Sequence, residues 1–149
     1  MPDPTANGTE TIHLRIPSRL ELLSFVDKVT LEVCARMQFD DEACSGISMA
    51  VIEAGTNAIQ HGHKKDPNQL VDMEFVMHPD QLEVVVHDHG AGFEIARLAD
   101  DVTTPEHLFD ARGRGIFIMR ACMDRVEFEF DGGTVCRLFK HRQPRPATV

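Results

Sequence analysis

VIEAGTNAIQH, residues 51–61, carries a carboxylate and a carboxamide one helical turn apart, at Glu53 and Asn57. Apolar residues around them recur at helical spacing, and residues four apart lie above one another on one helical face. Both polar side chains therefore fall on the flank of the apolar stripe, at the rim of a core. Their oxygens could hold magnesium, or Glu53 could act as a base, although a lone pair of this kind more often lies on a solvated helix face.

On the N-terminal side of this helix, the sequence predicts one strand and one further helix. Apolar and polar residues alternate over 11–16, which indicates a strand. A Ser-x-x-Glu capping box at 18–21 predicts a helix that runs to about residue 38. The helix of the opening segment would start at an N-cap of residue 40 or 41 and stop at Gly62.

The second half of the chain is predicted to consist mainly of strands, at residues 71–77, 82–86, 126–130 and 134–138. A short helix is expected over 116–124, directly after a glycine loop at 113–115. This order of elements predicts the α+β class, an α/β sandwich with helices on one face of a mixed, mainly antiparallel sheet.

A first glycine loop, DHGAGF at residues 88–93, ends one of these strands. Asp88 is in phase with the apolar residues of its strand, so its carboxylate is expected to face the core, where it needs a hydrogen-bond donor. An adenine amino group is one candidate, and a nearby hydroxyl or backbone amide is the other. Gly90 and Gly92 would let the backbone turn tightly against a flat ligand. On its own, this pattern also fits a plain turn.

The second glycine loop, Gly113-Arg114-Gly115, predicts an anion site where a helix begins. Glycines at a helix N-terminus expose backbone amides, the helix dipole adds attraction, and Arg112 and Arg114 add positive charge. A lone G-x-G also fits a simple loop and cap. Thr134 is a further candidate because it is in phase with core-facing residues of its strand, and ordinary strand propensity is the alternative explanation.

Composition and charge narrow the function classes. The chain has 149 residues, 42% hydrophobic and 26% charged, which predicts a single folded domain over residues 10–140 with loose termini at 1–9 and 141–149. The net charge of −9 disfavours direct nucleic-acid binding, because phosphate contacts need lysine and arginine. The sequence has neither an apolar run of the roughly 18 residues that cross a bilayer nor a secretory leader, so we expect no membrane contact and a cytoplasmic location.

Each of these sequence motifs is a weak signal alone, but together and in this order they resemble the motifs of one family. EAGTNAIQH is similar to the N box, DHGAGF to the first glycine box and GRGIFIMR to the second glycine box of the GHKL superfamily, the histidine-kinase-like ATPases. Thr134 in GGTVCRL resembles the strand threonine of that superfamily. The resemblance spans about residues 10–140 and is nearest to the bacterial anti-sigma-factor serine/threonine kinases. His89 and Ala91 depart from what the family often carries, including proline at the second position.

The resemblance implies a Bergerat-type ATP-binding fold that binds ATP and Mg²⁺, with a role for each motif residue. Glu53 would be the general base for a seryl or threonyl hydroxyl, and Asn57 would hold Mg²⁺. Asp88 would bond the adenine amino group, beside Gly90 and Gly92. The phosphates would face Arg112, Gly113, Arg114 and Gly115, Thr134 would lie near the adenine, and residues 94–111 would form the lid.

By the same resemblance, the protein would be an ATP-dependent serine/threonine kinase and anti-sigma factor in a partner-switching pathway. It would phosphorylate a STAS-domain anti-sigma-factor antagonist, bind and silence a sigma factor, and form a homodimer. An ATP-binding partner-switch module with little or no kinase activity is the alternative, and a detached histidine-kinase catalytic domain is a weaker one. A metal site at His61 and His63, or at His87 and His89, is a further alternative, without the cysteine or acidic ligands that usually accompany zinc.

Overall fold

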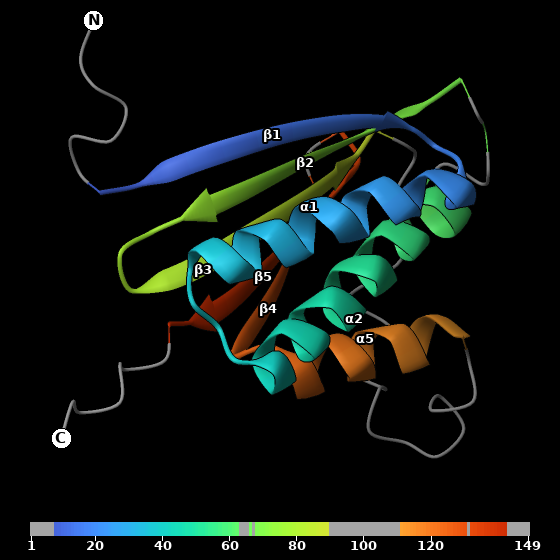
Figure 1. Cartoon of the computed structure of the whole chain (residues 1–149). Coiled ribbons are helices and arrows are strands. Elements are labelled where there is room, and N and C mark those ends of the chain that lie inside the picture. Colours follow the sequence, from blue (N-terminus) through green and yellow to red (C-terminus); the bar gives the residue numbers. More distant parts are fainter. Residues whose placement is uncertain (1–7, 63–65, 67, 90–110, 131, 143–149) are drawn as a thin grey trace, which may run out of the picture.

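A five-stranded antiparallel sheet, covered on one face by helices, makes up the described part of the chain (Figure 1). The computed structural model describes residues 8–62, 66, 68–89, 111–130 and 132–142. The strands lie in the order β1-β2-β3-β5-β4, and each neighbouring pair is antiparallel. Their bounds are β1 Glu10–Pro17, β2 Leu70–Met77, β3 Gln81–Asp88, β4 Arg125–Phe130 and β5 Thr134–His141. The predicted α+β class and the predicted strands are confirmed.

Alternation along the strands gives the sheet two different surfaces, because successive side chains point to opposite faces. In β3, Leu82, Val84 and Val86 are buried toward the helices. Asp88 continues this row, and the register places it opposite Thr134 of β5. Both polar side chains therefore belong to the helix side of the sheet, as their phase in the sequence predicts.

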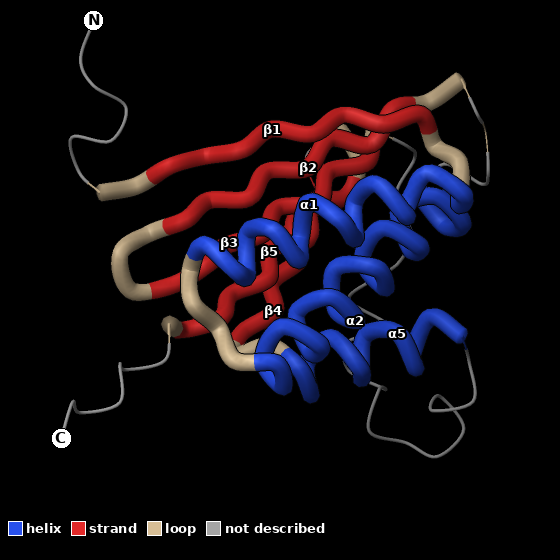
Figure 2. The backbone as a smooth tube through the Cα atoms, viewed as in Figure 1, coloured by secondary structure: helices blue, strands red, loops and turns tan. Residues whose placement is uncertain are grey.

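Three α-helices pack on that side of the sheet, α1 (Leu23–Arg36), α2 (Asp41–Asn57) and α5 (Ala111–Cys122), as Figure 2 shows. α2 lies between the other two and contacts both. Asp40 is the N-cap of α2, and its Oδ1 accepts a hydrogen bond from the Ala43 amide at 2.8 Å. No helix among the described residues is long and apolar enough to cross a membrane.

The predicted capping box at 18–21 does not begin the first helix. A 3₁₀ turn, η1 (Leu20–Leu22), comes first, and its N-cap is Arg19, without a side-chain cap. The Ser18 amide instead donates to the Gln69 carbonyl at 2.9 Å, just before β2. This backbone bond continues the β1–β2 pairing by one residue and delays the start of the helical segment.

α5 starts earlier than the sequence predicts. We expected a glycine loop at 113–115 and a helix over 116–124, whereas the helix spans Ala111–Cys122 and contains all three loop residues. Glycine is a poor helix former, but Gly115 is buried against α2. Packing against a neighbouring helix supplies most of the stability of a helix in a protein, and here it outweighs local propensity.

α2 continues directly into η2 (Ala58–Gly62), a π-helical turn. The predicted helix therefore reaches Gly62, but its last turn is wider than an α-helical one. Such π-turns are frequent at functional sites, and this one directly follows Asn57.

The core fills the layer between the helices and the sheet. Its largest fully buried side chains include Phe75, Ile47, Ile59, Met73, Leu82, Ile116, Met119 and Leu138. Polar residues interrupt this layer mainly at one place, where Asn57, Asp88 and Thr134 are buried around a shared cleft.

Candidate nucleotide-binding site

Glu53 and Asn57 lie on the flank of α2 that faces the first turn of α5. A Cβ placed on Gly115 would be 2.8 Å from Glu53 Oε2 and 3.5 Å from Asn57 Nδ2. Asn57 is 7% exposed and Glu53 is half-buried. The predicted N-box pair and the second glycine motif are therefore adjacent, although about 60 residues separate them in the sequence.

A small cleft opens beside this pair, between α2, α5 and the ends of β3 and β5. Its empty space is about 250 Å³ when the open solvent at its mouth is included, and only about 10 Å³ of it admits a water-sized molecule. It is lined by Ala54, Asn57, Ala58, Val86, Asp88, Met119, Phe128, Thr134 and Cys136. Asn57, Asp88 and Thr134, which the sequence singles out, thus meet in one place. Burial raises the pKa of Cys136 to about 12, so its thiol stays neutral and adds to the apolar part of the lining.

The polar atoms of this cleft fit a polar ligand. Asp88 is 2% exposed, and its Oδ1 accepts from the Thr134 amide at 3.4 Å. Within the described part of the chain, Asn57 Nδ2 and Thr134 Oγ1 are buried without a hydrogen-bond partner. Buried polar atoms in native proteins nearly always have partners, so these two atoms mark groups that a bound molecule or ion would satisfy. A flat heterocycle with amino groups, seated against apolar side chains, matches this lining.

Gly133 belongs to this site as well, although the sequence motifs did not single it out. Its φ is +144°, and a Cβ there would lie 2.0 Å from the Asp88 carbonyl oxygen. Only glycine allows the β4–β5 turn to press against the end of β3 in this way. The double glycine before Thr134 is the one sequence signal that could have revealed this contact.

The remaining predicted site residues are described only in part. Gly90, Gly92 and the lid residues up to 110 lie outside the described residues. Arg112 and Gly113 belong to the first turn of α5, where the structure describes their backbone alone, and Arg114 is exposed beside them. The predicted phosphate site thus falls within the first turn of a helix instead of in a loop before it. The first amides of a helix have no acceptor within the helix, so an anion could bind at this turn in either arrangement.

The alternative of a metal site at the histidines is not supported by the described residues. Among the described residues, no three histidine, cysteine, aspartate or glutamate side chains are grouped so that they could hold a metal ion. His63 lies outside the described residues, and His89 contacts Asp72 with its Nε2 2.7 Å from Oδ2.

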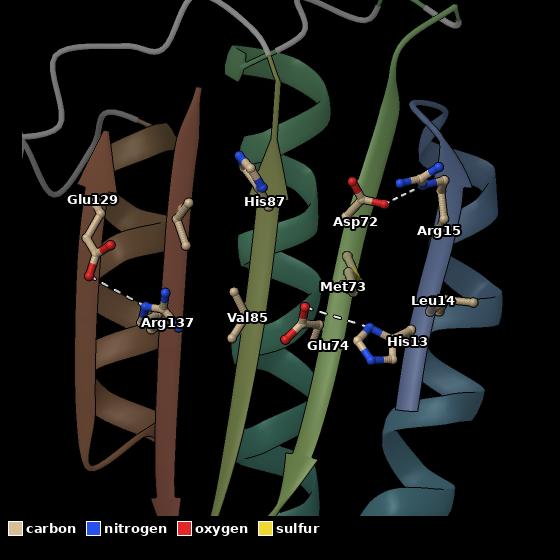
Figure 3. A pocket seen from close by; sticks show the side chains of 11 residues that line it. His13, Leu14, Arg15, Asp72, Met73, Glu74, Val85, His87, Glu129 and Arg137 are labelled. Atoms are coloured by element: carbon tan, nitrogen blue, oxygen red, sulfur yellow. Dashed lines mark hydrogen bonds and ion pairs between the residues drawn. The ribbon is translucent and has the colours of Figure 1, made fainter. Parts of the chain in front are cut away.

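A second, broader hollow lies on the opposite face of the sheet (Figure 3), called the helix-free face below because none of the described helices packs on it. Most of its polar residues form pairs: Arg15 with Asp72, His13 with Glu74, and Arg137 with Glu129. His87 also lines this hollow, and its Nε2 is buried without a hydrogen-bond partner among the described residues. None of Glu53, Asn57, Asp88 and Thr134 lines it. The two hollows differ in chemistry as well as in place, and the helix-side cleft is the one that the predicted residues share.

Known proteins place this arrangement in a family. Residues 16–140 match the family model described as the histidine kinase-like ATPase domain. The chain is 30% identical to the serine-protein kinase RsbW of Bacillus subtilis (strain 168) over 140 residues, which cover 91% of this chain and 88% of that protein. It is 28% identical to the RsbW of Bacillus velezensis over 91% of this chain and 88% of that protein. For the RsbW of Bacillus cereus (strain Q1) the identity is 27%, over 90% and 86%. With its fold, its cleft and a match over nearly its whole length, the chain belongs to the histidine kinase-like ATPase domain family.

Proposed function

We propose that the protein is an ATP- and Mg²⁺-dependent serine/threonine kinase that also acts as an anti-sigma factor in a partner-switching pathway. The observation that carries this proposal is the cleft that Asn57, Asp88 and Thr134 share, in which two buried polar atoms lack partners among the described residues. Glu53 lies one helical turn before Asn57 and faces Gly115 beside it. The relatives named serine-protein kinase RsbW, which match about nine-tenths of the chain, support the kinase assignment.

The adenine would occupy the cleft between α2 and β3. Asp88 would accept a hydrogen bond from its amino group, and the Thr134 hydroxyl would bond to the same ring or to a water beside it. Gly90 and Gly92 would shape the edge of this pocket. Because Asp88 is buried, an amino group that satisfies its carboxylate would be favoured over a base that presents an acceptor.

The phosphates would extend toward the first turn of α5. Gly113 and Gly115, together with Arg112 and Arg114, would face them, Gly113 through its backbone amide and Gly115 by leaving room beside Glu53 and Asn57. Asn57 would hold Mg²⁺ through its side-chain oxygen, which lies 3.6 Å from a Cβ built on Gly115. Magnesium, when bound, would neutralise charge that develops on the transferring phosphoryl group.

Glu53 would act as the general base. Its carboxylate would orient a seryl or threonyl hydroxyl of the substrate and take the proton from it. The hydroxyl oxygen then bonds to the γ-phosphorus while the bond from this phosphorus to the β–γ bridging oxygen breaks, which leaves ADP. Positioning by residues such as Glu53 and Asn57 supplies most of the acceleration in reactions of this type.

The proposed partners are a STAS-domain anti-sigma-factor antagonist, as the phosphate acceptor, and a sigma factor that the protein holds when the antagonist is phosphorylated. The protein would act in the cytoplasm, without direct contact to nucleic acid or to a membrane. The net charge of −9 agrees with a protein partner better than with nucleic acid.

A homodimer is part of the proposal, and the helix-free face of the sheet is the surface that would support it. β3 is the middle strand, so a two-fold axis parallel to the strands and centred on β3 places β1 over β4 and β2 over β5 of the second copy. Opposite charges then face each other: His13 and Arg15 meet Glu127 and Glu129, while Asp72 and Glu74 meet Arg137. Light scattering that gives a monomer mass at micromolar concentration would contradict the dimer and leave the kinase assignment untouched.

The test of the kinase assignment is incubation with γ-labelled ATP, Mg²⁺ and a panel of STAS-domain proteins, followed by mapping of the labelled residue. Acid-stable label on one serine or threonine of one panel member is the expected result. Nucleotide binding without transfer would favour the alternative of a binding module, and acid-labile label on histidine would favour a detached histidine-kinase catalytic domain.

A further inference from the structure

The end of β3, where Asp88 lies, is held by two contacts with the start of β5 and the glycine before it. The Thr134 amide donates to Asp88 Oδ1, and Gly133 approaches the Asp88 carbonyl so closely that no side chain would fit between them. The Gly133 contact also reaches the backbone of His89, the next residue, whose Cα lies 3.0 Å from a Cβ built on Gly133. The His89 side chain points to the other face of the sheet, because alternate side chains point to opposite faces.

On the helix-free face, Asp72 connects His89 to β1. Asp72 lies on β2, its Oδ2 is 2.7 Å from His89 Nε2, and its Oδ1 accepts from Arg15 Nε at 2.5 Å. Figure 3 shows the Arg15–Asp72 pair reaching across two neighbouring strands. The His89 ring also stacks on the His87 ring, with centroids 4.2 Å apart. Asp72 thus joins three neighbouring strands at the point where β3 ends.

The charge state of Asp72 agrees with this role. Partial burial raises the pKa of Asp72, but the hydrogen bonds from Arg15 and His89 lower it by more. The pKa of Asp72 therefore lies below its ordinary value. The carboxylate is therefore ionised at neutral pH and can accept from both partners at once.

We propose that Asp72, held by Arg15, is a positioning residue for nucleotide binding: through His89 it fixes the end of β3 and thereby the carboxylate of Asp88. This inference rests on the proposed function, in which Asp88 recognises adenine. Asp88 and His89 are adjacent and point to opposite faces, so a restraint on one limits the rotation of the peptide that bears the other. The β3 terminus is clamped by β5 and, through His89, by Asp72, which is the part of the clamp farthest from the ligand.

The chain offers a matched control on the same strand and the same face. Glu74 lies two residues from Asp72 and pairs with His13, with Oε1 3.7 Å from Nδ1, but this pair is far from the end of β3. Removing Glu74 therefore removes a neighbouring cross-strand contact on the same face without touching the restraint on His89.

The experiment is calorimetric titration of Mg-ADP into the full-length protein and its variants at pH 7.5. For Asp72→Ala and His89→Leu we expect the Kd for ADP to rise about three- to fivefold, the range that a partly exposed ion pair contributes. Glu74→Ala should bind as the wild type does. His89→Gln, whose amide can reach Asp72 as the ring does, should keep most of the affinity that His89→Leu loses. The kcat at saturating ATP should change little in any of these variants, because the effect lies in nucleotide binding.

The inference is overturned if Asp72→Ala binds ADP as tightly as the wild type, if Glu74→Ala weakens binding equally, or if His89→Gln is as weak as His89→Leu. Should Asp72→Ala fail to fold by circular dichroism, Arg15→Ala provides the same test from the other end of the bridge. Light scattering of each variant separates a loss of affinity from a change of oligomeric state. A wild-type protein that binds no ADP would overturn the proposed function itself, an outcome distinct from those that remove only the role of Asp72.

Discussion

The two faces of the sheet differ in how most of their polar side chains are paired. On the helix side, Asn57 Nδ2 and Thr134 Oγ1 are buried without partners among the described residues. On the helix-free face, Arg15, Asp72 and Glu74 are paired across strands and partly open to solvent. His87 Nε2 is the one buried polar side-chain atom there without a partner among the described residues. Unsatisfied buried polar atoms cost free energy, so a protein retains them where a ligand supplies the missing bonds. Partly exposed ion pairs contribute little individually and serve to orient what they connect. The helix side of the sheet therefore carries the proposed binding site, and the other face carries mainly cross-strand pairs that support it.

The largest effect is expected from Glu53→Gln on the helix side. Loss of a general base lowers phosphotransfer by about 100-fold or more, while ADP affinity stays near the wild-type value. Single-turnover transfer to the antagonist and a parallel ADP titration measure the two quantities. Glu74→Gln on the helix-free face is the matched control and should transfer normally. Equal transfer by Glu53→Gln and the wild type would remove Glu53 as the base.

A smaller but still clear effect is expected from Gly115→Ala. The added Cβ would lie 2.8 Å from Glu53 Oε2, so either the carboxylate or α5 must move, and we expect phosphotransfer to fall about tenfold, in line with overpacking costs of 1–3 kcal/mol. Gly46→Ala is the control in the same α2–α5 contact, because its Cβ would meet Cys122 Cβ at an ordinary 3.5 Å. If both substitutions reduce transfer alike, the close approach to Glu53 has no special role.

Thr134→Val tests through protein stability whether the buried Thr134 hydroxyl lacks a partner in the free protein. Without nucleotide, removal of a buried hydroxyl that lacks a partner should raise the free energy of unfolding by up to about 1 kcal/mol, while ADP binding weakens. Thr30→Val is the control, since Thr30 is also fully buried but its Oγ1 donates to the Val26 carbonyl at 2.7 Å. Urea unfolding and ADP titration give both readouts. A destabilised Thr134→Val protein would mean that the hydroxyl is already satisfied in the free protein.

The smallest effect is expected on the helix-free face, where pH offers the test. Arg15 and His89 lower the pKa of Asp72 below its usual 3.8, so the folded state binds this proton less readily than the unfolded state. The stabilisation is present above the unfolded pKa and is lost as pH falls through the lower, folded pKa. Asp72→Ala should therefore be less stable than the wild type by under about 1 kcal/mol at pH 7, and the difference should shrink below about pH 4. Urea midpoints at both pH values measure it, and a difference that grows on acidification would contradict the assignment.

Much of the fold could be predicted because its signals are local. Alternation identified the strands, helical spacing identified α1 and α2, and the phase of Asp88 placed its carboxylate on the helix side. The capping box at 18–21 and the start of α5 were wrong for a shared reason. In both places a contact with a distant segment, Gln69 in one case and α2 in the other, overrides the local preference.

By itself, the sequence determined which face of its strand or helix each of these side chains takes, because side-chain direction follows a period of two along a strand and of about 3.6 along a helix. It also determined that Glu53 and Asn57 share one helical face. Only the tertiary structure decided which of these residues meet. Asp88 and Thr134 are 46 positions apart, Arg15 and Asp72 are 57 apart, and Gly115 reaches Glu53 from another helix. Such contacts depend on strand order and helix packing, which no local pattern encodes, and that is why Gly133 and the Asp72 bridge became visible only in the folded chain.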